Sequence, residues 1–144
     1  MEINTKKSSN KEKVENFFFE EKDGQKVIRE ELLTSKAQDW AVSFIKARPP
    51  LNSAQLRRFY HDVKSLEAKV TSKGEFTSYK PLIKMLKSKV AYACPKTYGS
   101  RKVPWEFREF IWKCVDEINQ QEDFEAFALV FEAVVGYFYG EGGR

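Results

Sequence analysis

The side chains with the greatest capacity for chemistry in this sequence are clustered lysines and arginines. The segment YKPLIKMLKSKVAYACPK, residues 79–96, holds five lysines and no acidic residue. On a helix Lys80, Lys84 and Lys87 would form one positive edge, where like charges one turn apart repel each other. An acidic counterpart is therefore expected. Two sources stay open, namely the acids of the C-terminal helix and the phosphates of a ligand.

Charge is distributed unevenly along the 144 residues, although the net charge is only +4. Residues 46–113 contain 16 basic and 5 acidic side chains, whereas residues 114–144 contain 1 basic and 7 acidic side chains. A basic middle of this size favours an anionic partner, and the acidic end favours pairing within or between chains. A mixed, solvated surface is the alternative.

Further basic residues flank the lysine-rich segment. Arg57, His61 and Lys64 share one helical face, while Arg58 lies on the opposite border of the apolar stripe. The loop KTYGSRK adds positive charge and Tyr98, which could stack on a base or pack on its own domain. The candidate phosphate contacts are Arg57, Arg58, Lys64, Lys84, Lys87, Lys89, Lys96, Arg101 and Lys102.

Catalytic and metal-binding patterns are missing from the sequence. His61, Cys94 and Cys114 cannot complete a zinc site without carboxylates, and no CxxC or HExxH spacing occurs. A glycine-rich phosphate-binding loop is also missing. We therefore expect a protein that is not an enzyme and that uses neither a metal nor another cofactor.

The sequence also predicts where the protein is found. No apolar run approaches the roughly 20 residues of a membrane span, and the first residues lack the apolar core of a signal peptide. We expect a cytoplasmic protein without membrane contact. Its two cysteines should then be free thiols.

Hydrophobic periodicity predicts an all-α fold, a compact bundle of about five helices. The helical segments are 34–48, 52–70, 79–94, 104–118 and 122–140. Alternation at period two is not apparent. The expected organisation is a partly flexible, Phe-containing segment over 1–33, a helical bundle over 34–140 and a flexible tail over 141–144.

Several residues predict helix ends. The candidate N-caps are Thr34 or Ser35, Asn52 or Ser53, and Thr77 or Ser78. Gly74 would end the second helix, and Pro81 would fall in the first turn of the third.

The two ends of the chain raise further expectations. The polar segment 1–13 should fray, and Phe17, Phe18 and Phe19 should form a short helix or a strand-like arm that covers an apolar surface. Asp23-Gly24 indicates a turn. The last helix is apolar most of the way round, which predicts that it lies centrally in the bundle or pairs with another chain.

Three stretches, SAQLRRFYHDVKSLEAKV, KSKVAYACPK and FEAVVGYFYG, together resemble the small helical subunit of the type III-A CRISPR–Cas effector, the Csm complex. The resemblance covers residues from about 34 to 142. It implies a non-catalytic RNA-binding subunit that helps to hold the guide or target RNA. It also implies contact with other Csm subunits and with copies of itself, as a homodimer or a stacked filament.

The resemblance carries over to individual basic residues. Arg57 and Arg58 match the basic pair of the first motif, and Lys87 and Lys89 precede the Ala-Tyr-Ala segment of the second. The family places a basic residue after that segment. Here the loop CPKTYGSR is longer, so that Lys96, Arg101 and Lys102 all remain candidates for the role.

Other functions fit parts of the pattern. The main alternative is a purely structural helical adaptor whose basic region binds an acidic protein partner. A DNA-binding module lacks a convincing helix-turn-helix, because the breaks RPPLN and SKGEF differ from its usual short turn. A small nuclease would need a carboxylate cluster that the sequence does not indicate.

Overall fold

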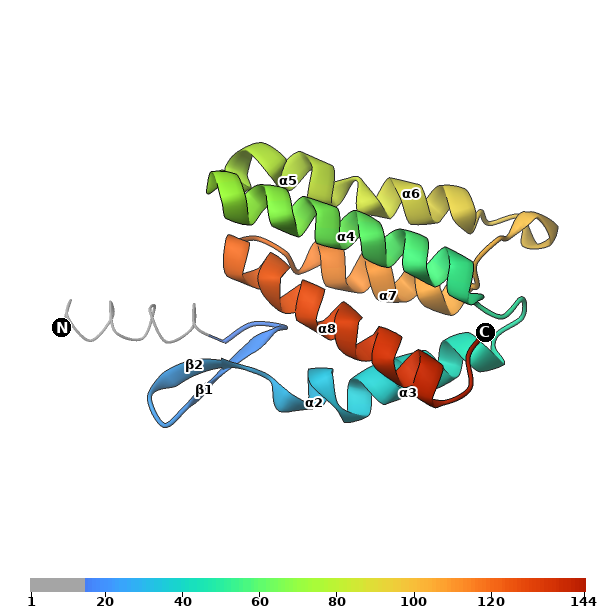
Figure 1. Cartoon of the computed structure of the whole chain (residues 1–144), viewed down its shortest axis with the longest axis horizontal. Coiled ribbons are helices and arrows are strands. Elements are labelled where there is room, and N and C mark those ends of the chain that lie inside the picture. Colours follow the sequence, from blue (N-terminus) through green and yellow to red (C-terminus); the bar gives the residue numbers. More distant parts are fainter. Residues whose placement is uncertain (1–14) are drawn as a thin grey trace.

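The fold is an all-α bundle, as the sequence predicts. A computed structural model describes residues 15–144, apart from the side chain of Lys73, and the expected fraying of 1–13 lies outside the described residues. The bundle consists of α3 (Ser35–Lys46), α4 (Ser53–Lys73), α5 (Phe76–Lys84), α6 (Leu86–Ala93), α7 (Trp105–Asp116) and α8 (Gln121–Gly140) (Figure 1). The remaining elements are β1 (Phe19–Lys22), β2 (Gln25–Ile28), α2 (Glu30–Leu33) and the short 3-10 helix η1 (Tyr98–Ser100).

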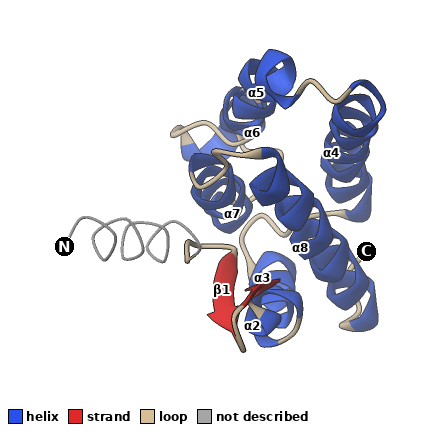
Figure 2. Ribbon diagram, turned by 90° about the vertical axis from the view of Figure 1, so that its left-hand side faces the viewer, coloured by secondary structure: helices blue, strands red, loops and turns tan. Residues whose placement is uncertain are grey.

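Helix α8 runs through the middle of the bundle. Figure 2 shows α3, α4 and α7 arranged around it. Its residues Phe124, Phe127, Phe131 and Phe138 are completely buried. This central position, one of the two alternatives for a helix that is apolar almost all round, is confirmed, and pairing with another chain stays a prediction.

Aromatic rings join the helices to one another. Phe107 of α7 lies 5.3 Å from Phe44 of α3 and 5.2 Å from Phe59 of α4, measured between ring centroids. Phe110 lies 5.7 Å from Phe131 of α8 in an edge-to-face arrangement. Because such rings lose large apolar areas from water and also attract each other, this cluster fixes α4 and α7 relative to one another.

The third predicted helix is divided into α5 and α6 at Met85. The chain keeps its direction there, because Met85 N donates to the Pro81 carbonyl at 3.0 Å and the Met85 carbonyl accepts from Lys89 N at 3.1 Å. The prediction that Pro81 falls in the first turn is wrong. Helix α5 begins at Phe76, so that Pro81 lies inside it and removes one intrahelical hydrogen bond.

The predicted helix ends are partly confirmed. The Asn52 side chain accepts a hydrogen bond from Gln55 N at 2.9 Å, and Gly74 ends α4 with a left-handed φ of 63°. Thr34 lies between α2 and α3 at the N-cap position of α3, as one of the predicted alternatives, but its hydroxyl donates to the Glu30 carbonyl and forms no cap hydrogen bond. The third predicted cap is wrong, because Thr77 and Ser78 lie inside α5.

The N-terminal Phe segment enters a β-hairpin, which is the strand-like alternative. Its turn is at Asp23 and Gly24, whose φ angles of 52° and 78° suit the twist of a two-residue hairpin. Alternation at period two was not apparent in the sequence, because strands of four residues are too short to show it. Phe18 and Phe19 are buried in the core of the bundle, as expected for a covering arm.

The last residues lie against the bundle through hydrogen bonds. Gly143 N donates to the Phe138 carbonyl at 2.8 Å, and the Ser53 hydroxyl donates to the Arg144 carbonyl at 2.8 Å. The domain boundaries at 34 and 141 stay predictions. Within the described part of the chain, none of the helices combines the length and the apolar character that crossing a membrane would require.

Candidate nucleic-acid interface

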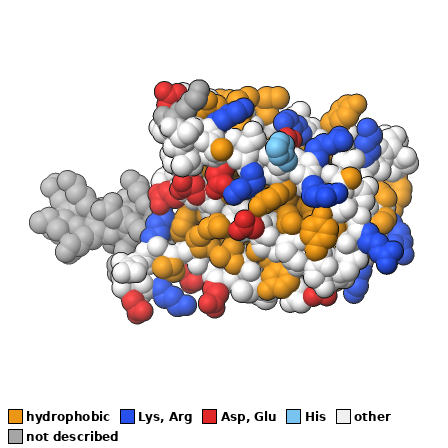
Figure 3. Space-filling model, viewed as in Figure 1, with side chains coloured by type: hydrophobic (Ala, Val, Ile, Leu, Met, Phe, Trp, Pro, Cys, Tyr) orange, Lys and Arg blue, Asp and Glu red, His pale blue; other side chains and the backbone are white. Residues whose placement is uncertain are grey.

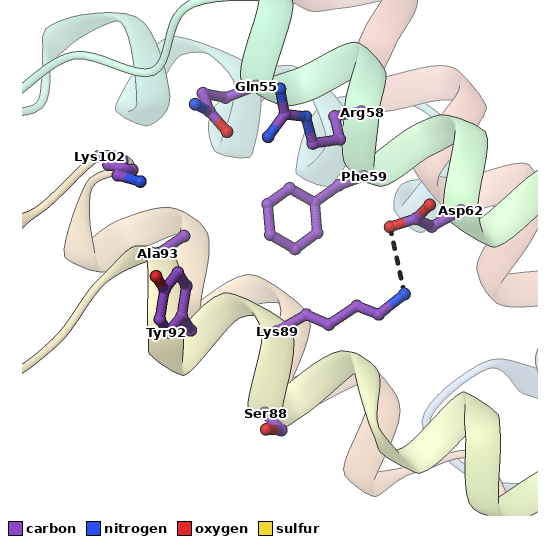
Figure 4. Close-up of a pocket in the computed structure, with 9 residues that line it drawn as sticks. All are labelled: Gln55, Arg58, Phe59, Asp62, Ser88, Lys89, Tyr92, Ala93 and Lys102. Atoms are coloured by element: carbon purple, nitrogen blue, oxygen red, sulfur yellow. Dashed lines mark hydrogen bonds and ion pairs between the residues drawn. The ribbon is translucent and has the colours of Figure 1, made fainter.

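A groove of about 380 Å³ lies between α4 and α6, on the side of the bundle away from the hairpin (Figure 1). We call it the α4–α6 groove. The residues that line it are Gln55, Arg58, Phe59, Asp62, Ser88, Lys89, Tyr92, Ala93 and Lys102 (Figure 4).

Helical periodicity explains why these side chains meet. On α4, Gln55, Arg58, Phe59 and Asp62 are spaced by three or four residues and therefore share one face. Helix α6 presents Ser88, Lys89, Tyr92 and Ala93 in the same way. Lys102 comes from the loop after α6, and its backbone N–H is tied to the Ala93 carbonyl at 2.8 Å.

The groove has an apolar floor and a positively charged rim. Phe59 and Ala93 are buried, whereas Arg58, Lys89 and Lys102 are exposed. Asp62 is the acidic residue among the lining side chains, and its carboxylate lies 3.5 Å from the Lys89 ammonium. The lining therefore carries more positive than negative charge. Figure 3 shows several Lys and Arg side chains on this upper part of the molecule.

Tyr92 stands at the mouth of the groove and is 80% exposed. The Lys102 ammonium lies 5.7 Å from the centre of its ring. Figure 4 shows Tyr92 on α6 and Phe59 on α4, two of the residues that line the groove from its two helices. Tyr92, Gln55 and Ser88 were not among the residues selected from the sequence. The signal that could have found Tyr92 is its position three residues after Lys89, on the same helical face.

A row of stacked cations and aromatic rings holds the loop that carries Lys102. We call it the cation–aromatic ladder, and its members in spatial order are Tyr98, Arg101, Trp105, Arg108, Trp112 and Lys87. Successive members lie 4.5–4.9 Å apart, measured from the cation to the ring centre. At this separation each pair is attractive.

Backbone hydrogen bonds reinforce the ladder. Arg108 donates to the Cys94 carbonyl at 2.8 Å, and Arg101 donates to the Pro95 carbonyl at 2.9 Å. The Tyr98 hydroxyl donates to the Arg48 carbonyl at 3.0 Å. Tyr98 therefore packs on its own domain, which was one of its two predicted alternatives.

Two lysines of the positive edge contact the C-terminal end of α7. The Lys84 ammonium donates to the Val115 carbonyl at 2.7 Å, and the Lys87 ammonium lies 2.5 Å from the Asp116 carboxylate. Positive charge at a helix C-terminus is favourable, because the exposed carbonyls there carry partial negative charge. Burial, followed by the charge of Lys80, lowers the pKa of Lys84.

The acidic counterparts of the lysines come from α4 and α7. Asp62 and Asp116 fill this role, and in the part of the chain that the structure describes no acid of α8 forms an ion pair with the lysines of 79–96. Of the two sources left open by the sequence, the acids of the C-terminal helix are therefore not the ones that pair with these lysines in the described residues. Its acids are used elsewhere, since Glu122 pairs with Lys26 at 3.2 Å.

The structure brings three of the nine sequence-predicted site residues, Arg58, Lys89 and Lys102, together in the groove. Lys64 pairs with Glu67 at 2.7 Å, and this hydrogen bond raises the pKa of Lys64. The side chains of the other five lie outside the lining. These are Arg57, Lys84, Lys87, Lys96 and Arg101. The assignment of all nine to RNA stays a prediction.

Other reactive groups are buried. Cys94 and Cys114 are free thiols with no exposed surface, as expected, and burial raises the pKa of both. Among residues 15–144 no three His, Cys, Asp or Glu side chains are placed to hold a metal ion.

A comparison with known families places the chain in one of them. The family model for Csm2 of type III-A matches residues 28–143. No curated protein and no solved structure gives a significant match. Because the match covers most of the chain, the protein belongs to the Csm2 family, and it is a structural subunit of a type III-A CRISPR complex that associates with other Csm subunits.

Proposed function

We propose that this member of the Csm2 family is a non-catalytic subunit that holds single-stranded RNA, guide or target, through sequence-independent phosphate contacts in the α4–α6 groove. It would act in the cytoplasm, with copies of itself and other Csm subunits as neighbours. The single observation that carries the proposal is the convergence of Arg58, Lys89 and Lys102 on one groove, from two helices and a loop.

The chemistry of these three side chains suits a phosphate backbone. The Arg58 guanidinium offers a planar fork of donors, and the ammonium groups of Lys89 and Lys102 act as point charges. Such contacts supply affinity without reading bases. In an RNA-guided complex the pairing of guide and target reads the sequence, so the protein needs only a positive surface of suitable shape.

The remaining predicted residues would act outside the groove. Arg57 precedes Arg58 on α4 and is exposed, and Lys96 is exposed in the loop that leads to Lys102. Both are proposed as outer phosphate contacts. Lys84 and Lys87 contribute mainly to the end of α7, because a carbonyl and a carboxylate engage their ammonium groups.

The test is fluorescence anisotropy of a labelled single-stranded RNA of about 30 nucleotides, titrated with the full chain at several salt concentrations, with duplex DNA measured alongside. We expect binding that weakens steeply with salt, because each phosphate contact on a single strand contributes about 0.7 to the logarithmic slope. A variant with Arg58→Gln, Lys89→Gln and Lys102→Gln should lose about 2 from that slope, which corresponds to three contacts.

The matched control removes three positive charges elsewhere. Lys22, Lys36 and Lys46 are exposed, have no ion pair among the described residues, and lie on β1 and α3. Their replacement by Gln changes the net charge equally and should leave the slope within about 0.5 of the wild-type value. Equal losses for both variants would show that general charge, and not the groove, attracts RNA. Absence of RNA binding together with salt-sensitive capture of an acidic protein would favour the adaptor alternative, and preference for duplex DNA would overturn the proposal.

A further inference from the structure

We infer that the α4–α6 groove also binds a nucleobase, with one base of the single-stranded RNA stacked on the ring of Tyr92. The inference rests on the proposed function and adds a second kind of contact to it. The ligand class is an unpaired purine or pyrimidine, and Tyr92 supplies the stacking surface.

The exposure of Tyr92 is the first observation. Most large aromatic side chains of the described residues are buried or half-buried, but Tyr92 is 80% exposed on a helix whose neighbouring Val90 and Ala93 are buried. Its hydroxyl has no hydrogen-bond partner among the residues that the structure describes. An aromatic ring in water gains free energy when a flat apolar partner covers it.

The surroundings of Tyr92 identify the partner. An apolar partner would not suit a rim that carries Arg58, Lys89 and Lys102. A nucleotide combines a flat base with a phosphate, so it matches both the ring and the cations. Base stacking on aromatic residues in a positively charged groove is the general way in which proteins hold single-stranded nucleic acid.

Other aromatic residues near this face are already occupied. Trp105 has Arg101 and Arg108 within 4.9 Å of its ring centre, and Trp112 has Arg108 and Lys87 within 4.7 Å. Tyr92 has one cation near its ring, Lys102 at the longer distance of 5.7 Å. The groove that Tyr92 and Phe59 help to line has a volume of about 380 Å³.

Gln55 gives the groove a polar group that tolerates different bases. It lines the groove on the α4 side, and its side-chain amide forms no hydrogen bond within residues 15–144. An amide can both donate and accept, so it can meet the edge of any base without strong selection. Stacking with this adaptable contact agrees with sequence-independent binding.

The experiment compares Tyr92→Ala with the matched control Tyr92→Phe. Anisotropy is measured for the full chain with a labelled single-stranded RNA and with an abasic strand of equal length, which has the phosphates but no bases. We expect Tyr92→Ala to weaken RNA binding by about 5- to 100-fold, to leave abasic binding within about twofold, and to leave the salt slope unchanged. Tyr92→Phe should retain RNA binding, because the ring is kept.

The outcomes separate the two proposals. If the wild-type chain binds RNA and Tyr92→Ala binds it equally well, the stacking contact is wrong and the phosphate contacts stand. If Tyr92→Ala weakens RNA and abasic binding alike, the ring acts by positioning cations, and stacking is again refuted. If the wild-type chain binds no RNA at all, the proposed function and the stacking contact both fail. Circular dichroism of each variant confirms that the helical content is retained.

Discussion

Replacement of Arg108 by methionine tests whether the cation–aromatic ladder stabilises the fold. The guanidinium lies 4.6 Å from the Trp105 ring centre and 4.7 Å from that of Trp112, and it donates to the Cys94 carbonyl at 2.8 Å. Methionine keeps much of the length and apolar contact of the side chain, but it loses the charge and the donors. The change therefore removes these three interactions and leaves most of the packing.

The expected loss follows from these contacts. A hydrogen bond from a charged donor contributes about 1.5–3 kcal/mol, and each cation–π contact contributes about 0.5–1 kcal/mol at a partly exposed site. The methionine side chain recovers part of this by packing on the two indoles. We expect a net loss of about 2–3 kcal/mol in the free energy of unfolding, which for a chain of this size lowers Tm by about 6–9 °C.

The assay is thermal unfolding followed by circular dichroism, with Arg57→Met as the matched control. Arg57 is exposed and makes no side-chain hydrogen bond or ion pair among the described residues, so the same substitution should change stability by less than about 0.5 kcal/mol. A Tm for Arg108→Met within about 2 °C of wild type would refute the reasoning. Equal losses in both variants would show that arginine removal itself, and not the ladder, lowers stability.

Two further predictions concern other parts of the fold. Asp123 is 2% exposed and accepts hydrogen bonds from Asn16, Asn119 and Gln120, so Asp123→Ala should lower the free energy of unfolding in urea by about 1–3 kcal/mol, and a loss below about 0.5 kcal/mol would contradict this role. The pKa of Tyr60 is raised from 10.0, first by burial and then by its hydrogen bond to Glu132. Because the folded pKa is the higher one, the contribution of Tyr60 is complete below pH 10 and is lost as the pH rises through the folded value. Tyr60→Phe should therefore show a smaller fall in urea stability above pH 10 than wild type, and identical slopes would refute this linkage.

The helical architecture could be predicted because its signals are local and repeated. Leu56, Phe59 and Val63 recur at helical spacing and are all buried on one face of α4. Asn52 and Gly74 mark its ends by side-chain and backbone preferences that depend little on the rest of the fold. Such features can be predicted from a single segment of the sequence without knowledge of the rest of the fold.

The parts that could not be predicted depend on contacts between distant segments. The hairpin is held to the bundle by Asn16, whose amide donates to Asp123 at 3.0 Å across 107 positions of sequence. Helix α5 begins at Phe76 without a side-chain cap at Glu75, and Phe76 packs against the core of the bundle. Neither feature has a local pattern that would identify it.

The candidate site also combines features that a local sequence pattern predicts with features that depend on contacts between distant segments. Charge segregation pointed to the two helices that line the groove, because Arg58 and Lys89 were both among the predicted basic residues of those helices. Charge segregation could not distinguish Lys89 from Lys84, which lies about one and a half helical turns earlier. The different environments of these two lysines are set by α7. Helix α7 ends beside Lys84, so that the Val115 carbonyl engages that ammonium, while Lys89 faces α4 and the groove.

This distinction determines how many charges are available to RNA. If all nine predicted residues contacted phosphates, the salt slope on single-stranded RNA would be about −6, since each contact contributes about 0.7. The three groove cations alone would give a slope of about −2. The basic middle of the chain contains 16 basic residues, but intramolecular pairs such as Lys87 with Asp116 and Lys64 with Glu67 already neutralise part of that charge. If such a pair breaks so that the lysine can reach a phosphate, one ionic contact replaces another, and the free energy of RNA binding gains little. For the isolated chain the three groove cations, together with the outer contacts Arg57 and Lys96, therefore predict a slope between about −2 and −3.5. A slope near −6 would require paired lysines such as Lys87 and Lys64 to leave their carboxylates when RNA binds.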